Sequence, residues 1–139
     1  MKYYLDTCIW IDFIENRYDG LNPIGEYAFL FLKKCKKHKE TIFYSQHILI
    51  ELEQYKYSLF DFINCFTINF KEIKFTTKEV LDSNDLSKKL KMPRGDALHS
   101  ILAKSRGAVV ITRDKHFEKI KIVKSNKYPI YIIFLKTSR

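Results

Sequence analysis

The 139-residue sequence has few residues of the kinds that build linkers, disulfide frameworks or membrane spans. It contains only four glycines and three prolines and no low-complexity segment, which leaves little room for linkers or disordered tails. No stretch approaches the roughly 20 apolar residues that cross a membrane. The N-terminus has an acid, Asp6, inside its apolar run and no small-residue cleavage site, which argues against a signal peptide. We therefore expect one soluble, cytoplasmic domain over residues 1–139.

The cysteines and histidines form no recognisable ligand pattern. The three cysteines, at positions 8, 35 and 65, are odd in number, which suits neither a disulfide framework nor a zinc site, and we predict buried free thiols. The four histidines, His38, His47, His99 and His116, show no paired spacing. A histidine-based metal site is therefore not expected.

Basic side chains are abundant, since 25 Lys and Arg against 16 Asp and Glu give a net charge of +9. In a small domain this charge suggests a polyanionic partner, and nucleic acid before membrane because no basic amphipathic helix with an aromatic anchor face is visible. A basic surface that serves solubility alone is the alternative. The lysines of residues 33–39 have two explanations, because cations at a helix carboxyl end suit the helix dipole and could also contact phosphates.

Short apolar strands near residues 2, 41, 108 and 130 are separated by helical patterns. This alternation indicates an α/β fold with a mainly parallel central sheet flanked by helices. Ligands of such folds bind outside the carboxyl ends of the strands.

The boundaries of other elements are less regular. The alternation of apolar residues over 66–70 suggests a half-exposed strand. The sequence of residues 76–79 is a capping box that opens a helix, and Asp85 is predicted to cap a further short helix through Leu90.

The two acids near the N-terminus, Asp6 and Asp12, are predicted to lie in different environments. Asp6 lies at the carboxyl end of the first strand, where a ligand site is expected. Asp12 lies opposite the apolar face of the helix that follows Thr7, so we predict that it is solvated.

The helix after Ser45 offers two glutamates. Glu51 lies about 60° from the apolar stripe of this helix and Glu53 about 140°, so Glu51 flanks the core while Glu53 points to water. A carboxylate on a buried flank costs several kcal/mol unless it is paired, protonated or bound to a metal. Pairing of Glu51 with a lysine is the purely structural alternative.

Residues 95–117, GDALHSILAKSRGAVVITRDKHF, combine a helix, a turn and a strand with two acids. Asp96 can cap the helix, Gly107 ends it, and residues 108–112 form an apolar run typical of a strand buried on both faces. Asp114 follows the carboxyl end of this strand. The predicted buried face of the helix consists of Leu98, Ile101, Leu102 and Ser105.

The opposite side of this helix would carry Asp96, His99, Ser100 and Ala103, with room for a ligand beside the two small residues. His99 is therefore predicted to be a surface histidine, which could touch substrate from its position one turn after Asp96. Phe117 is expected in the core.

Four motifs together resemble the PIN-domain nucleases, in particular their small bacterial and archaeal branch, the VapC-type toxins of type II toxin–antitoxin pairs. They are LDT at residues 5–7, the Ser45-opened helix with Glu51, GDALHSILAKSRG with Asp96, and VVITRDKHF with Asp114. The resemblance covers nearly the whole chain in order and length. It leaves Glu53 as a rival of Glu51 and gives no counterpart for the lysine-rich carboxyl tail.

The resemblance implies a three-layer PIN-like fold and a Mg²⁺- or Mn²⁺-dependent endoribonuclease with one or two ions. Its catalytic and metal-binding acids would be Asp6, Glu51, Asp96 and Asp114, and the hydroxyl of Thr112 would support Asp114. It further implies an RNA substrate, a homodimer and an antitoxin protein that blocks the acidic pocket. Four carboxylates in one cleft repel one another, which raises one or more of their pKa values until a divalent cation relieves the repulsion.

Candidate contacts to substrate phosphates are the basic residues beside the acids, Arg94, Arg113 and Lys115, together with His99. Pairing of a basic residue with a site carboxylate is the alternative.

Two other functions are alternatives. A PIN-like domain could bind RNA or protein without cleavage, although four carboxylates without metal would repel RNA. A receiver-like phosphoacceptor would carry two adjacent acids after the first strand, whereas Asp6 stands alone in LDT.

Overall fold

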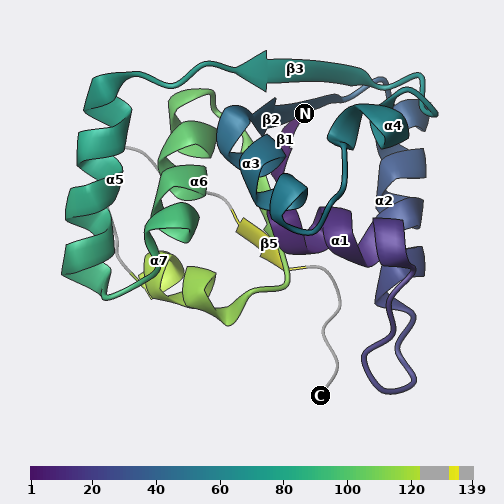
Figure 1. Ribbon diagram of the computed structural model, residues 1–139, viewed down its shortest axis with the longest axis horizontal. Coiled ribbons are helices and arrows are strands. Elements are labelled where there is room, and N and C mark those ends of the chain that lie inside the picture. The colour runs from purple at the N-terminus through teal and green to yellow at the C-terminus, as the bar shows by residue number, and fades with distance from the viewer. Residues whose placement is uncertain (123–131, 135–139) are drawn as a thin grey trace.

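The computed structural model describes residues 1–122 and 132–134. Five strands and seven α-helices lie along this part of the chain (Figure 1). In order they are β1 (Lys2–Leu5), α1 (Thr7–Glu15), α2 (Ile24–Lys37), β2 (Thr41–Ser45), α3 (Gln46–Gln54), α4 (Leu59–Ile63), β3 (Asn69–Ile73), α5 (Thr77–Leu90), α6 (Arg94–Ser105), β4 (Val109–Thr112), the 3₁₀ turn η1 (Lys115–Phe117), α7 (Glu118–Ile122) and β5 (Ile132–Phe134).

The five strands form one parallel sheet in the order β3-β2-β1-β4-β5. In the central register Tyr4 lies opposite Phe43 of β2 and Val110 of β4. The predicted α/β fold with its parallel sheet is thus confirmed. The strand expected between residues 66 and 70 lies three residues later, at Asn69–Ile73.

The middle of the sheet is covered on both faces. All four residues of β4 are buried, as are Tyr4 and Leu5 of β1. Figure 1 shows α5 and α6 side by side at one end of the molecule and α1 against α2 toward the other, and both pairs are in contact. Gly25 permits the close approach of α1 and α2, because a Cβ at this position would lie 2.5 Å from the backbone oxygen of Asp12.

Two predictions about helix ends need correction. The capping box at Thr76 and Glu79 is present, but it opens one continuous helix, and Asp85 is an exposed residue within it rather than a cap. No Gly or Pro interrupts α5, so nothing ends it early. Helix α6 begins at Arg94 after Pro93, so Asp96 lies in its first turn and does not cap it.

The predicted buried face of α6 is confirmed for Leu98 and Leu102, which are buried, but not for its other two residues. Ala97, His99, Ser100 and Ala103 are buried, whereas Ile101 is half-buried and Ser105 is exposed. The reason is that α6 is covered on more than one side, by α5 as well as by β1 and β4. The small residues at positions 97, 100 and 103 therefore provide close packing and not a ligand cavity.

Two polar predictions also fail. Asp12 is not solvated but 1% exposed, because Arg113 binds it from 101 residues away. Of the three cysteines, Cys35 is buried, Cys8 is half-buried and Cys65 is exposed, so the prediction of buried thiols is wrong for Cys65. Phe117 is fully buried, as predicted.

Candidate active site

The end of β1 places the first acid at the carboxyl edge of the sheet. Asp6 caps α1, and its Oδ1 accepts a hydrogen bond of 2.8 Å from the backbone N–H of Thr7. Its Oδ2 accepts a second bond of 2.8 Å from the hydroxyl of Thr112, which ends the adjacent strand β4. The carboxylate is only 4% exposed, so β1 and β4 together fix its orientation.

Asp114 approaches the same point two residues after β4. Its backbone N–H donates a 3.0 Å hydrogen bond to the hydroxyl oxygen of Thr112, which is the hydroxyl that donates to Asp6. One hydroxyl group therefore links the side chain of Asp6 to the backbone of Asp114. Asp114 also caps the turn η1, where its Oδ1 accepts a bond of 2.9 Å from the N–H of His116.

Asp96 comes to this edge from the first turn of α6. The imidazole of His116 lies between the two aspartates, with Nδ1 3.1 Å from Asp96 Oδ2 and 3.1 Å from Asp114 Oδ1. Burial raises the pKa of Asp96 to about 6, and the negative charges of Asp6 and Asp114 add to this rise. Three aspartates from three different elements thus share one electrostatic environment.

Glu51 lies on the half-buried flank of α3, as predicted, but its nearest partners are histidines. Its Oε1 is 2.6 Å from Nε2 of His99 and 3.2 Å from Nε2 of His47. Burial would raise the pKa of Glu51, but the hydrogen bond with His99 and the nearby imidazoles lower it overall. Nε2 of His99 is also 3.8 Å from Asp6 Oδ1, so His99 connects Glu51 to the aspartates.

The prediction that His99 lies on the surface is wrong, because its side chain is fully buried. Its Nδ1 is 2.6 Å from the hydroxyl of Tyr4, which in turn lies 2.8 Å from the hydroxyl of Ser45. Burial alone would lower the pKa of His99, but the hydrogen bond with Glu51 and the charge of Asp6 raise it overall. A residue so enclosed does not face a substrate directly.

Three histidines, His47, His99 and His116, surround the acids in a way that was not predicted from the sequence. A signal existed for His47, which lies one helical turn before Glu51 on the same face. No local signal linked His99 to Tyr4 or Glu51, which are 95 and 48 residues away.

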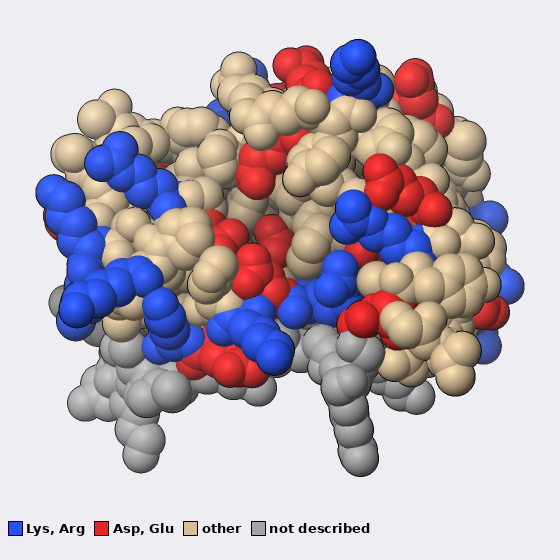
Figure 2. All heavy atoms as spheres, turned by 60° about the horizontal axis from the view of Figure 1, so that its bottom comes forward, with Lys and Arg blue, Asp and Glu red and all other residues tan. Residues whose placement is uncertain are grey.

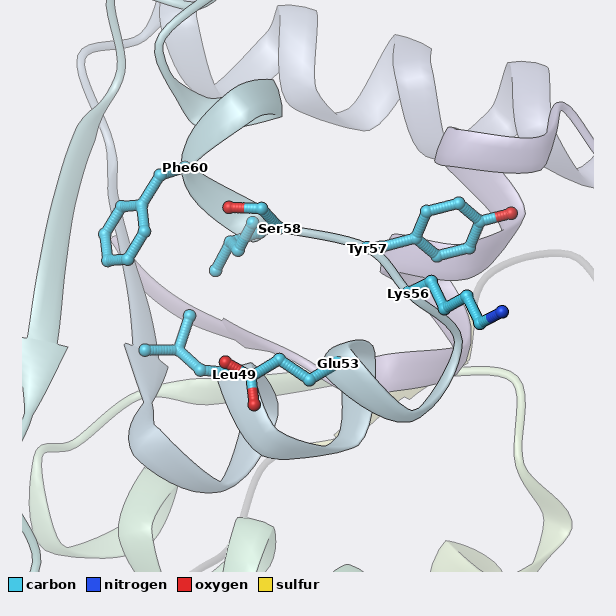
Figure 3. Close-up of a pocket in the computed structure, with 7 residues that line it drawn as sticks. Leu49, Glu53, Lys56, Tyr57, Ser58 and Phe60 are labelled. Carbon is cyan, nitrogen blue, oxygen red and sulfur yellow. The ribbon is translucent and has the colours of Figure 1, made fainter.

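The rival glutamate, Glu53, is exposed and lies elsewhere on α3. It lines a pocket of about 290 Å³ between α3 and α4, together with Leu49, Lys56, Tyr57 and Phe60 (Figure 3). The geometry thus favours Glu51 as the glutamate beside the aspartates.

The basic residues near the acids divide into two kinds. Arg113 is held away from them by Asp12, to which its Nε and one terminal nitrogen donate hydrogen bonds of 2.7 and 2.8 Å. Arg94 and Lys115 are exposed. Figure 2, which brings the lower side of Figure 1 forward, shows acidic side chains in a central hollow that Lys and Arg side chains border.

The donor atoms fit a hard divalent cation. Ligand atoms of Asp96, Asp114 and His116 lie within 4.8 Å of one another. Burial raises the pKa of Asp96, and repulsion by the charges of Asp6 and Asp114 raises it further. Mg²⁺ and Mn²⁺ prefer carboxylate oxygens and would relieve this repulsion.

The fold and the site together define a class: parallel α/β proteins that gather acids at the carboxyl edge of the sheet. Within that class, residues 3–123 match the model of the PIN domain, and the chain therefore belongs to the PIN domain family.

Three solved structures have a similar fold. The chain is 20% identical to a chain of VapBC2 from Rickettsia felis bound to a DNA fragment from its promoter, with a TM-score of 0.67 over 98% of this chain and 100% of that one. It is 21% identical to a chain of a toxin–antitoxin complex from Klebsiella pneumoniae, with a TM-score of 0.55 over 83% of this chain and 89% of that one. The chain is 13% identical to a chain of FitAcB from Neisseria gonorrhoeae, with a TM-score of 0.58 over 95% of this chain and 96% of that one.

No curated protein matches the chain significantly. In the part of the chain that the structure describes, none of the helices has the length and apolar character to cross a membrane.

Proposed function

We propose that this chain is a metal-dependent endoribonuclease that hydrolyses RNA phosphodiester bonds, and that residues 1–139 form its single nuclease domain. The observation that carries the proposal is the convergence of Asp6, Asp96 and Asp114 at one sheet edge, where burial and mutual charge raise the pKa of Asp96 to about 6. PIN-domain proteins are nucleases that generally use divalent metals.

The catalytic and metal-binding acids in this proposal are Asp6, Glu51, Asp96 and Asp114, which would hold one or two Mg²⁺ or Mn²⁺ ions. When bound, such an ion supplies Lewis-acid chemistry that activates the attacking water and stabilises negative charge on the phosphate. The hydroxyl of Thr112 positions both Asp6 and Asp114. Asp6 is further aligned by the first N–H group of α1.

The charge distribution supports a polyanionic substrate. Without the four proposed ligands, the chain carries 25 basic and 16 − 4 = 12 acidic side chains, so the rest of the chain has a net charge of 25 − 12 = +13. Lys and Arg side chains border the acidic hollow (Figure 2). Arg94 and Lys115 are the proposed phosphate contacts, because both are exposed beside the acids. Arg113 and His99 are not proposed as substrate contacts. Asp12 binds the guanidinium of Arg113, and the side chain of His99 is fully buried.

We further propose that the chain is the cytoplasmic toxin of a type II toxin–antitoxin pair and acts as a homodimer. The likeness to chains from VapBC2 and from the Klebsiella toxin–antitoxin complex supports this role. Its antitoxin would cover the acidic hollow. Co-purification of the chain with the product of a neighbouring short reading frame, with loss of RNA cleavage in the complex, tests this partner.

A PIN domain that binds RNA or protein without cleavage is the second candidate function. The intact set of four acids argues against it, because carboxylates without a cation repel RNA. Family membership also removes the receiver-like phosphoacceptor from consideration.

The decisive experiment compares RNA cleavage by the wild-type chain and by Asp96→Asn, each with Mg²⁺, Mn²⁺ or EDTA. The wild-type chain should cleave only with metal, and the variant should lose roughly 100-fold or more, because even residues that merely orient metal ligands contribute about 10- to 100-fold.

Asp85→Asn is the matched control, since Asp85 is an exposed acid in the middle of α5. Its activity should equal that of the wild type. Full metal-dependent cleavage by a correctly folded Asp96→Asn would overturn the assignment, and RNA binding without cleavage by the wild type would favour the second function.

A further inference from the structure

We propose that His47, Glu51 and His99 form a binding site for a divalent transition-metal ion beside the aspartate cluster. Ligand atoms of these three residues lie within 4.8 Å of one another. Glu51 Oε1 is 3.2 Å from His47 Nε2 and 2.6 Å from His99 Nε2. Two atoms bound at about 2.0–2.1 Å to one tetrahedral ion lie roughly 3.4 Å apart, so the first pair already has a suitable separation and the second need open only slightly.

The site is built from two helices. His47 and Glu51 are four residues apart on α3 and therefore project from the same face. His99 comes from α6, 52 residues after His47, so no short sequence spacing announces the site. The expectation that the histidines bind no metal rested on that missing spacing.

The surroundings of His99 suit a metal ligand. Its Nδ1 lies 2.6 Å from the Tyr4 hydroxyl, and the Tyr4 hydroxyl lies 2.8 Å from that of Ser45. All three side chains are fully buried. Histidines that bind metal through one nitrogen usually donate the other N–H to a fixed partner. Here Nδ1–H can donate to Tyr4, whose own O–H donates to Ser45, and this arrangement leaves the Nε2 lone pair for an ion.

The donor atoms of this site favour a different ion than the donor atoms of the aspartate cluster do. Two imidazoles and one carboxylate suit Zn²⁺, Co²⁺, Mn²⁺ or Ni²⁺, whereas Mg²⁺ prefers oxygen ligands only. The side chains of His47 and Glu51 are 29% and 30% exposed, so a bound ion would keep a coordination position open to solvent. Because a carboxylate has two oxygens, Glu51 can serve this site and the aspartate cluster together.

Gly95 provides the space for His47. A Cβ at position 95 would lie 2.9 Å from His47 Nε2, which is the proposed ligand atom. Since Gly95 lies in helix α6, alanine is compatible with its backbone. The variant Gly95→Ala should therefore push the imidazole aside without removing a donor group.

The test is a Co²⁺ titration of the metal-stripped full-length chain, followed by visible absorption, with Zn²⁺ as competitor and saturating Mg²⁺ present to occupy oxygen-only sites. The wild type should bind Co²⁺ with a nitrogen-ligand spectrum that Zn²⁺ abolishes. His47→Ala and Gly95→Ala should each weaken binding by about 10-fold or more. His38→Ala is the control, because His38 is exposed at the end of α2.

Circular dichroism must show that the variants are folded, as expected for the partly exposed His47 and for a helical Gly→Ala change. Equal Co²⁺ affinity in the wild type, His47→Ala and Gly95→Ala would overturn the proposal. Loss of binding in His116→Ala but not in His47→Ala would also overturn it, because the ion would then belong to the Asp96, Asp114 and His116 group. The titration contains no RNA, so its result is independent of the proposed nuclease function.

Discussion

Asp6 and Asp12 lie at the start and in the middle of the same helix, α1, and both are almost completely buried, at 4% and 1% exposure. Asp12 receives two hydrogen bonds from the guanidinium of Arg113. Asp6 instead receives bonds from a backbone N–H and a hydroxyl, and its charge contributes to the raised pKa of Asp96. One buried acid is thus neutralised within the fold, and the other belongs to a cluster that an external cation can complete.

The two regions are also connected. Arg113 is adjacent to Asp114 in the chain, yet its guanidinium is directed to Asp12. Asp12 therefore binds the arginine that directly precedes Asp114 in the chain. Within the described residues, the side chains of Asp6, Glu51, Asp96 and Asp114 lie within ion-pair distance of the histidines at positions 47, 99 and 116.

The largest expected effect on stability comes from breaking the neutralised pair. Arg113→Met should remove both hydrogen bonds to buried Asp12, leave Arg17 at 4.0 Å as its remaining cation, and reduce the free energy of unfolding by about 3–5 kcal/mol. Urea denaturation measures the loss. The double variant Asp12→Leu with Arg113→Met should recover most of it, because a buried ion pair is often replaceable by apolar residues. A single Arg113→Met variant as stable as the wild type would show that the pair is not structurally important.

In the aspartate cluster, by contrast, the negative charge of Asp96 is expected to destabilise the metal-free protein. Without metal, the folded state holds a proton on Asp96 up to a pKa of about 6, whereas the unfolded chain releases it near the ordinary value of 3.8. Between these values the folded state binds more protons, so the stability of the metal-free protein should fall as the pH rises from about 4 to 6.

Asp96→Asn should remove this pH dependence and raise the melting temperature of the metal-free protein above pH 6. Saturating Mg²⁺ should stabilise the wild type in that pH range and have less effect on the variant. Thermal unfolding across pH, with EDTA or Mg²⁺, checks both statements. A metal-free variant that melts below the wild type at neutral pH would contradict the repulsion on which they depend.

The smallest effects are expected at the rim of the hollow. Lys115→Ala should weaken RNA binding and lower the slope of log affinity against log salt by about 1, because one phosphate contact is lost. Lys71→Ala on the outer strand β3 is the matched control and should leave the slope unchanged. Nitrocellulose filter binding with Asp96→Asn as the uncut background provides the measurement. Equal slopes would exclude Lys115 as a phosphate contact.

The sequence predicted those features that depend on short-range order. Asp6 and Asp114 follow apolar strands, and the strands of a parallel α/β sheet bring such acids to one edge. Glu51 could be chosen over Glu53 from its angle to the apolar stripe of α3. Each of these inferences uses residues within one element or next to it.

The features that were missed depend on contacts between distant residues. Asp12 looked solvated because its partner Arg113 is 101 residues away, and His99 looked exposed because Tyr4 and Glu51 lie on other elements. A polar residue is predicted to be outside unless its partner is known. The buried face of α6 was predicted only in part for the same reason, since β1, β4 and α5 surround this helix.

An NMR titration of the side-chain carboxyl carbons with and without Mg²⁺ tests most directly whether a divalent cation completes the aspartate cluster. In the metal-free protein Asp96 should titrate with a pKa of about 6. Saturating Mg²⁺ should lower this pKa well below that value, because the cation favours the carboxylate. A pKa of Asp96 that does not respond to Mg²⁺ or Mn²⁺ would contradict the account.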